Sequence, residues 1–335
     1  MAIDTGIWSK QQFGVAIQVE TAVGTKTSNA MLRINNDDIV WLNQPLIQEI
    51  GVKSGGSRVH DKKDIYVSDY GSRCSVQVPM ILESDTTLDT ILHENVMGAT
   101  TGSAPAAVAL VYNYTSAEMA VGTAASGNLY TLTLQLISPE AGEAIWLVGA
   151  VCTHLDVSLA ADADGGRRHA TATFETLFRP LDGAAIVAPT TFGTTYRYLR
   201  DLTTKKQVGG VDVIMNKLEY SIDNPLSTAG MTSDGFPEVM TRGMNEGAVA
   251  TGTIGIKYDA NTASFWQLRR AGTTVAVELS NHTTWASSSF GLLCNQAAIT
   301  SEITPTATDS GAFIDLGVEF LADVTSTKNV LDIVP

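Results

Sequence analysis

Hydrophobic and polar residues alternate along much of the chain, which is the pattern of a β-strand with one buried face. In Ser75–Leu82, the residues Val76, Val78, Met80 and Leu82 share one side, and Ser75 and Gln77 lie on the other. The same period predicts strands over Tyr130–Leu136, Ile145–Leu159 and Ala170–Phe178. Residues 13–27 are expected to form a strand that breaks at Gly24, and Ile39–Ile50 a strand that alternates less regularly.

A change of period after residue 82 predicts one short helix. Leu88, Ile91 and Leu92 are spaced as on one helical face, Ser84 or Asp85 is placed to cap its start, and Gly98 to end it. Residues 99–128 are rich in Ala, Gly, Ser and Thr and predict a loop, with one further strand over 108–114.

The stretch Met215–Tyr258 combines two alternating segments with a long loop. Leu218, Tyr220 and Ile222 mark the first strand, Ile254 and Ile256 the second, and the residues between are rich in Gly, Ser, Thr and Met. Such a loop buries little of itself, so we expect it to contact a partner, namely another copy of the chain.

The order of predicted elements occurs twice. An offset of 176 carries Val78, Met80 and Leu82 onto Ile254, Ile256 and Tyr258; near the end of the repeat an offset of 146 carries Phe174 onto Phe320. The difference of 30 matches an insertion near 99–128 in the first copy. We therefore expect an internal duplication: a first domain over 1–178, a linker or arm over 179–210, and a second domain over 211–335.

Composition supports a folded, β-rich protein. Of the 335 residues, 44% are hydrophobic and only 17% charged, and the net charge is −14. That charge argues against nucleic-acid binding, which needs a basic surface. Cys74, Cys152 and Cys294 form no CxxC pair, so buried free thiols are expected. The sequence shows neither a signal peptide nor a membrane-spanning run, which predicts synthesis in a cytoplasm.

Candidate chemistry is sparse. The five histidines match no metal-ligand spacing, and His93 and His282 are expected to be solvated. The segment Asp162-Ala-Asp164-Gly165 begins like a calcium loop, but position 12, counted from Asp162 as position 1, is Thr173 and not the glutamate that such loops need. A hairpin turn is therefore predicted. No catalytic, metal or cofactor-binding motif is present, so no enzyme activity is expected. A loop of mixed charge, containing Lys53, Arg58, Asp61, Lys62, Lys63 and Asp64, is suited either to a complementary neighbour or to solvent.

Three segments together resemble the tail tube (major tail) proteins of tailed bacteriophages. They are FGVAIQVETAVGT near the start, SVQVPMILESDTTLDTILHENVMG at 75–98, and LEYSIDNPL, GFPEVMTRG and ATGTIGIKYD between Leu218 and Asp259. The resemblance implies a mainly β fold: two tandem tail-tube-type β-sandwich or barrel domains, each with one short flanking α-helix. It also implies a structural virion protein that polymerises into stacked rings, the conduit for genomic DNA during ejection from a long non-contractile tail.

The implied partners are other copies of the chain, with DNA passing the lumen without sequence-specific binding. A two-domain subunit predicts homotrimeric, pseudo-hexameric rings, with hexamers as the alternative. Tape-measure, tail-terminator and tail-tip or baseplate proteins are further partners implied by the family. The loops 51–73 and 227–247 occupy equivalent places and are expected to join successive rings through Lys53, Arg58, Asp61, Lys62, Lys63, Asp64, Asp234, Glu238 and Arg242.

Three other functions remain open. An adhesin or carbohydrate-binding module would use an aromatic groove, for which Trp146, Trp266 and Trp285 are the candidates. A β-rich hydrolase is disfavoured by the missing catalytic constellation. A secretion-system tube shares the domain but usually has a single copy of it.

Overall fold

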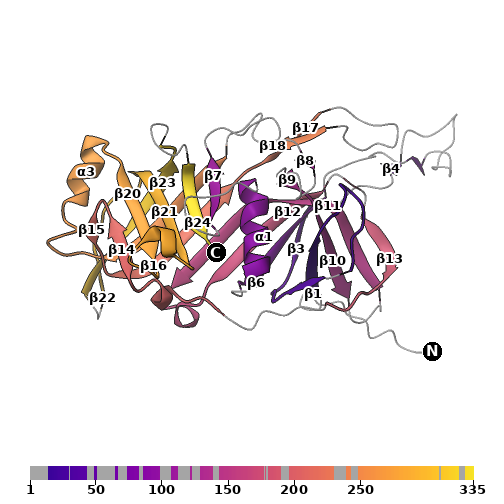
Figure 1. The fold of residues 1–335 in the computed structure, drawn as a ribbon, viewed down its shortest axis with the longest axis horizontal. Helices are drawn as coiled ribbons and strands as arrows, with labels where there is room; N and C mark the ends of the chain where they lie inside the picture. Colours follow the sequence, from indigo (N-terminus) through magenta and orange to yellow (C-terminus); the bar gives the residue numbers. More distant parts are fainter. Residues whose placement is uncertain are drawn as a thin grey trace.

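The protein is mainly β (Figure 1). The computed structural model describes residues 14–29, 31–43, 49–50, 65–66, 74–82, 86–98, 107–111, 121–122, 129–138, 143–176, 178, 180–189, 196–229, 239–242, 248–308, 311–323 and 329–335. In these ranges, 18 strands are connected by hydrogen bonds into one sheet system, and two α-helices, α1 and α3, pack beside it.

The first half of the chain forms a group of strands around the long strand β11. In this group β1 pairs with β2 and β10, β10 with β11, β11 with β12 and β13, β12 with β6, and β6 with β3, all antiparallel. The elements are β1 (Gly14–Val19), β2 (Leu32–Ile34), β3 (Val40–Asn43), β6 (Cys74–Ile81), α1 (Thr86–Met97), β10 (Leu132–Ser138), β11 (Glu143–Ala160), β12 (His169–Thr176) and β13 (Leu181–Ala185).

The second half forms a group around β21. Here β14 pairs with β15 and β20, β20 with β21, β21 with β23 and β24, β23 with β19, and β19 with β16. The elements are β14 (Lys205–Val208), β15 (Val211–Asp212), β16 (Met215–Asp223), β19 (Val249–Lys257), α3 (Phe265–Ala271), β20 (Val275–Ser280), β21 (Gly291–Ile299), β23 (Gly311–Leu321) and β24 (Asn329–Val334).

Of the remaining described strands, two extend these groups and six form separate two-stranded sheets. β7 (Val108–Val111) pairs with β24, and β22 (Thr306–Thr308) with β23. Two small hairpins stand between β3 and β6 and between β16 and β19: β4 (Glu49–Ile50) with β5 (Ile65–Tyr66), and β17 (Leu226–Ala229) with β18 (Val239–Arg242). β8 (Val121–Gly122) pairs in parallel with β9 (Leu129–Tyr130).

The two groups are joined by direct strand pairing. β11 pairs with β16 over seven residue pairs, from His154↔Asp223 to Ala160↔Lys217. Eight strands therefore follow one another in the order β3–β6–β12–β11–β16–β19–β23–β21. Because β11 has 18 residues, its first part belongs to the β10 and β13 side and its second part to this eight-strand sheet.

One main hydrophobic core runs through both halves. It lies on one face of the eight-strand sheet, where Leu155, Val157, Leu218, Tyr220 and Ile254 point inward and are 5% exposed or less. In Figure 1, α1 lies at the middle of the molecule, between the indigo-to-magenta strands and the orange-to-yellow strands, whereas α3 lies at the far end of the second group. α1 contacts both β11 and β16.

The structure confirms the strands predicted over 75–82, 130–136, 145–159 and 170–178, and both strands of Met215–Tyr258. The predicted helix is α1, and Gly98 ends it with a φ of 93°. Ile39–Ile50 is not one strand, because Val40–Asn43 pairs with β6 whereas Glu49–Ile50 belongs to a separate hairpin. The expected strand over 13–27 is β1, followed by a turn. Within the expected linker, β13 and β14 are hydrogen-bonded into the two groups.

Candidate functional site

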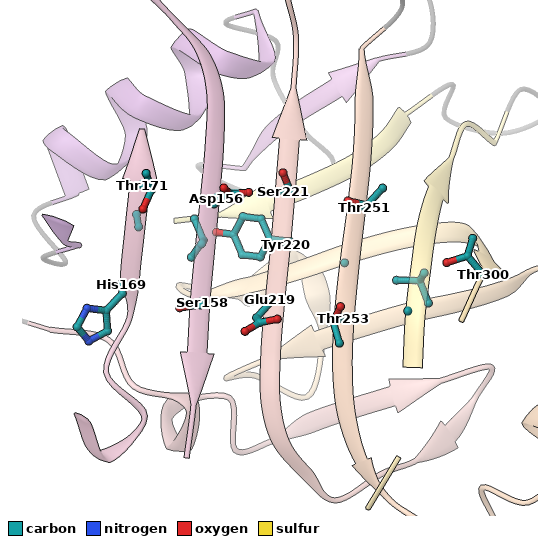
Figure 2. Close-up of a pocket in the computed structure, with 15 residues that line it drawn as sticks. Asp156, Ser158, His169, Thr171, Glu219, Tyr220, Ser221, Thr251, Thr253 and Thr300 are labelled. Atoms are coloured by element: carbon teal, nitrogen blue, oxygen red, sulfur yellow. The ribbon is translucent and has the colours of Figure 1, made fainter. Parts of the chain in front are cut away.

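The face of the eight-strand sheet opposite the core carries a polar hollow of about 480 Å³. Figure 2 shows its side chains standing on neighbouring strands of both halves. Hydroxyl groups and carboxylates dominate the lining, and the labelled Tyr220 is a core residue of β16. The polar lining residues are Asp156, Ser158, His169, Thr171, Glu219, Ser221, Thr251, Thr253 and Thr300.

Strand geometry explains why these side chains meet. Successive side chains of a strand point to opposite faces, so the residues between the buried positions all share the open face. The pairing register then aligns them in rows across the sheet. Two such rows are Thr171–Asp156–Ser221–Thr251–Glu319 and His169–Ser158–Glu219–Thr253. Residues from positions 156 to 319 thus form one surface.

We name this surface the polar sheet face. It comprises the outward residues of β12, β11, β16, β19 and β23, and its charge is predominantly negative. The face contains six carboxylates and two lysines. The carboxylates are Asp156, Glu175, Glu219, Asp223, Asp315 and Glu319, and the lysines are Lys217 and Lys257. Lys217 is itself 2.9 Å from Glu219, so the surface has little free positive charge to attract phosphate.

One histidine on this face carries charge more readily than usual. His154 Nε2 lies 2.9 Å from Asp156 Oδ2, and His154 Nδ1 lies 3.8 Å from Asp223 Oδ1. The hydrogen bond with Asp156 raises the pKa of His154, and burial only partly opposes it. The same hydrogen bond lowers the pKa of Asp156. The pair is solvent-accessible, and its chemistry is that of a surface ion pair.

Behind the sheet, a buried polar network joins the two halves of the chain. Asp89 and His93 of α1 and Arg168 before β12 are all fully buried, and Arg168 Nη2 donates to Asp89 Oδ2. His93 Nε2 lies 3.0 Å from the hydroxyl of Tyr220, which belongs to β16. The guanidinium of Arg168 is 5.2 Å from the ring of Phe290, also from the second half. The expectation that His93 is solvated is therefore wrong.

Hydrogen-bond chemistry assigns the state of this network. His93 Nδ1 lies 2.8 Å from the main-chain oxygen of Asp89, which can only accept, so Nδ1 carries the proton. Burial alone would raise the pKa of Asp89, but the charge of Arg168 and the contacts with His93 outweigh it and leave that pKa lowered. Burial raises the pKa of Tyr220, which keeps its hydroxyl neutral. The network is a buried ion pair with His93 and Tyr220 packed against it, and its burial leaves no access for a substrate.

A second buried carboxylate, Glu20, holds the turn after β1. It accepts hydrogen bonds from the main-chain N–H of Gly24 at 2.8 Å and of Gly149 at 2.7 Å, and from the hydroxyls of Thr131 and Thr133. Burial nevertheless raises the pKa of Glu20, with these hydrogen bonds opposing the shift. Glu20 thus ties the turn to β10 and β11, which is a structural role.

The sequence-predicted contact residues fall mainly on parts of the chain that the structure does not describe. Lys53, Arg58, Asp61, Lys62, Lys63, Asp64, Asp234 and Glu238 lie outside the described residues. Arg242 is described and ends β18, where its main chain pairs with that of Leu226. The three candidate tryptophans do not form a groove, since Trp146 and Trp285 are buried and Trp266 alone is exposed.

Other site types are not represented in the described ranges. There, no three His, Cys, Asp or Glu side chains gather as metal ligands would, and neither helix has the length and apolar character needed to cross a membrane. The three cysteines are buried free thiols, as expected. Sequence reasoning missed the polar sheet face as a unit, although its alternation was visible strand by strand. No protein-family model matches the chain, and no curated protein matches it.

Proposed function

We propose that this protein is a structural subunit that polymerises into stacked rings and forms the tail tube of a tailed bacteriophage. The observation that carries the proposal is the polar sheet face, a single surface built from both halves of the chain on an eight-strand sheet. A sheet with one face buried in the core and one solvent-exposed, predominantly acidic face is suited to form a segment of a tube wall. Within the described residues, the outer edge of β3 has no strand partner, and such an edge invites further strand pairing.

The subunit is proposed to contain two tandem β-domains of one fold, over 1–178 and 211–335, with 179–210 between them. The support is that the pairings around β11 and around β21 follow the same order. In the first half, β11 pairs with β10, β12 and β13. In the second half, β21 pairs with the corresponding strands β20, β23 and β24. Each half also has a helix at the same place in the chain order: α1 lies between β6 and β10, and α3 lies between β19 and β20. If each chain has two such domains, a closed ring of three chains contains six domains.

The proposed tube is a passage for DNA. Phosphate is repelled by carboxylates, so an acidic lining keeps DNA from adhering as it moves. The six carboxylates of the polar sheet face suit that task, and the chain as a whole has a net charge of −14. The protein would act in the virion, beside the tape-measure, terminator and tail-tip proteins that the family resemblance implies, and without catalysis.

Negative-stain microscopy of the purified chain tests this proposal. Hollow rings or tubes are expected, and averaging of end-on views should give three copies per ring, measured as threefold symmetry with a weaker sixfold repeat. Rings of six chains would preserve the tube and contradict the trimer. A chain that stays monomeric at every concentration would contradict the proposed function. No observation favours the adhesin, because the three tryptophans do not share a surface.

A further inference from the structure

The two helices differ in what covers them. In α1, every residue from Leu88 to Met97 is buried or partly buried. In α3, Phe265 is buried, but Trp266, Gln267 and Arg270 are exposed. Trp266 is 47% exposed, and its ring is 5.2 Å from the guanidinium of Arg270. A single exposed aromatic residue is common on a protein surface, so what distinguishes Trp266 is its position relative to α1.

Strands β11 and β7 cover much of α1, and the second half of the chain completes the cover. His93 contacts the Tyr220 hydroxyl at 3.0 Å, and Asn224 donates to the Val96 carbonyl at 2.8 Å. Both partners belong to β16 or the residue after it. α1 therefore closes the junction at which β16 pairs with β11.

The two helices can be aligned on the glycine that ends each of them. Gly98 and Gly272 both have positive φ, 93° and 63°, as helix-ending glycines commonly do. Counting back from these glycines places Trp266 at the position of Leu92, Gln267 at that of His93, and Arg270 at that of Val96. Gln267 and Arg270 thus correspond to His93 and Val96, the two α1 positions that contact β16 or the residue after it, and Trp266 lies one helical turn before Arg270.

Among the described strands, none beside α3 takes the position that β16 has beside β11. On β11, the pairing with β10 reaches Ala150, and β16 occupies the same edge from His154 onward. On β21, the pairing with β20 reaches Ala297, and beyond it no described strand takes the place of β16. At the other end of the eight-strand order, β3 pairs only with β6 within the described residues, and exposes Val40 by 37% and Leu42 by 53%.

From these observations we propose that the α3 face formed by Trp266, Gln267 and Arg270 docks on the β3 end of a second copy of this chain. In the two halves, β3 and β16 are equivalent strands, because β3 pairs with β6 and β16 pairs with β19. The β3 strand of the second copy would therefore lie beside β21 as β16 lies beside β11. Trp266 would then cover the junction between β21 and the second copy's β3, as α1 covers the junction between β11 and β16. It would pack against residues near Trp41 of the second copy. This inference rests on the proposed function, for which it names the contact between neighbouring copies.

The test compares assembly of Trp266→Ala with that of Leu181→Ala, an exposed leucine on β13 that is 43% exposed and away from α3. Because Trp266 is exposed in the free chain, both variants should fold, which circular dichroism and thermal melting check. The concentration at half-assembly, followed by sedimentation and microscopy, should rise about 30-fold or more for Trp266→Ala, as for a hot-spot tryptophan. It should stay at the wild-type value for Leu181→Ala.

A photo-crosslinking amino acid at position 266 of the full chain adds a direct readout. Crosslinks to a peptide containing residues 31–43 of a second copy support the proposal. Rings that form normally from Trp266→Ala, or crosslinks confined to other regions, overturn it and leave the tube function intact. A wild-type chain that never assembles overturns both the tube function and this contact.

Discussion

Asp89 and Arg168 show how a single charge pair can hold distant parts of the chain together. Both side chains are fully buried, and they connect α1 to the segment that enters β12, beneath Phe290 of the second half. A buried ion pair adds little over a well-packed apolar replacement, but removal of one partner leaves the other charge without compensation. The pair is therefore sensitive to single substitutions at either side.

We predict that Asp89→Asn lowers the free energy of unfolding at pH 7 by about 3–5 kcal/mol. The pKa of Asp89 is lowered from an ordinary value of 3.8, so its stabilisation is present above that pH and is lost as pH falls through the folded value. The difference between variant and wild type should thus shrink below about pH 4. Urea unfolding at several pH values measures this, with Asp315→Asn as the exposed control. A constant difference down to pH 2 would contradict the role of the carboxylate charge.

At the scale of elements, two glycines decide how the turn after β1 meets β11. Gly24 and Gly149 both have positive φ, and the ring of Phe178 lies between them. A Cβ on Gly149 would stand 2.2 Å from Phe178 Cδ2, and one on Gly24 would stand 2.4 Å from Phe178 Cε1. Neither glycine can therefore gain a Cβ unless Phe178 or the backbone shifts.

We predict that Gly149→Ala destabilises the protein by about 1–3 kcal/mol or more, through the clash and the strained φ. Denaturant unfolding measures the change, and Gly210→Ala is a useful control, since it also has positive φ but a Cβ there meets nothing within 4 Å. The control isolates the backbone strain from the clash. Partial recovery in the double variant Gly149→Ala, Phe178→Ala is expected; equal loss in both glycine variants would exclude the contact with Phe178.

The elements themselves were largely predictable from the chain, because period-2 alternation is a local property. Val76, Val78 and Met80 lie inward on β6, as their spacing predicts. His93 was not predictable, since its burial depends on Tyr220, which is 127 residues away in the sequence. Nor was the polar sheet face, because the alignment of Asp156 with Ser221 is decided by the β11–β16 pairing, and the sequence contains no local signal of that pairing.

At the scale of the whole molecule, the distribution of charge matters more than any one carboxylate. Asp315 and Glu319 are exposed on β23, within the polar sheet face. Replacing both by lysine would leave the core face of the strand unchanged, because the core residues Ile314, Leu316 and Val318 point to the other side. Tube assembly should therefore persist while the lining becomes attractive to phosphate.

We predict that the double variant Asp315→Lys, Glu319→Lys retains double-stranded DNA at low salt, whereas wild-type tubes do not. The retention should fall steeply as salt rises, because binding releases counterions from DNA. Co-sedimentation of tubes with DNA measures it. The matched control, Asp162→Lys with Asp212→Lys, changes the net charge equally at exposed positions outside the polar sheet face. Equal retention by both double variants would show that overall charge, and not this face, governs contact with DNA.

Local sequence patterns were enough to assign the inward and outward residues of β6, β10, β16 and β19, the position of α1, and the turn at 162–165. These features depend on periodicity and on backbone preferences within a few residues. The pairing of β11 with β16, the contact of Arg168 with Asp89, and the exposed face of α3 beside the covered α1 follow from the three-dimensional fold. Those outcomes depend on contacts between residues far apart in the chain, whose energies no local pattern contains.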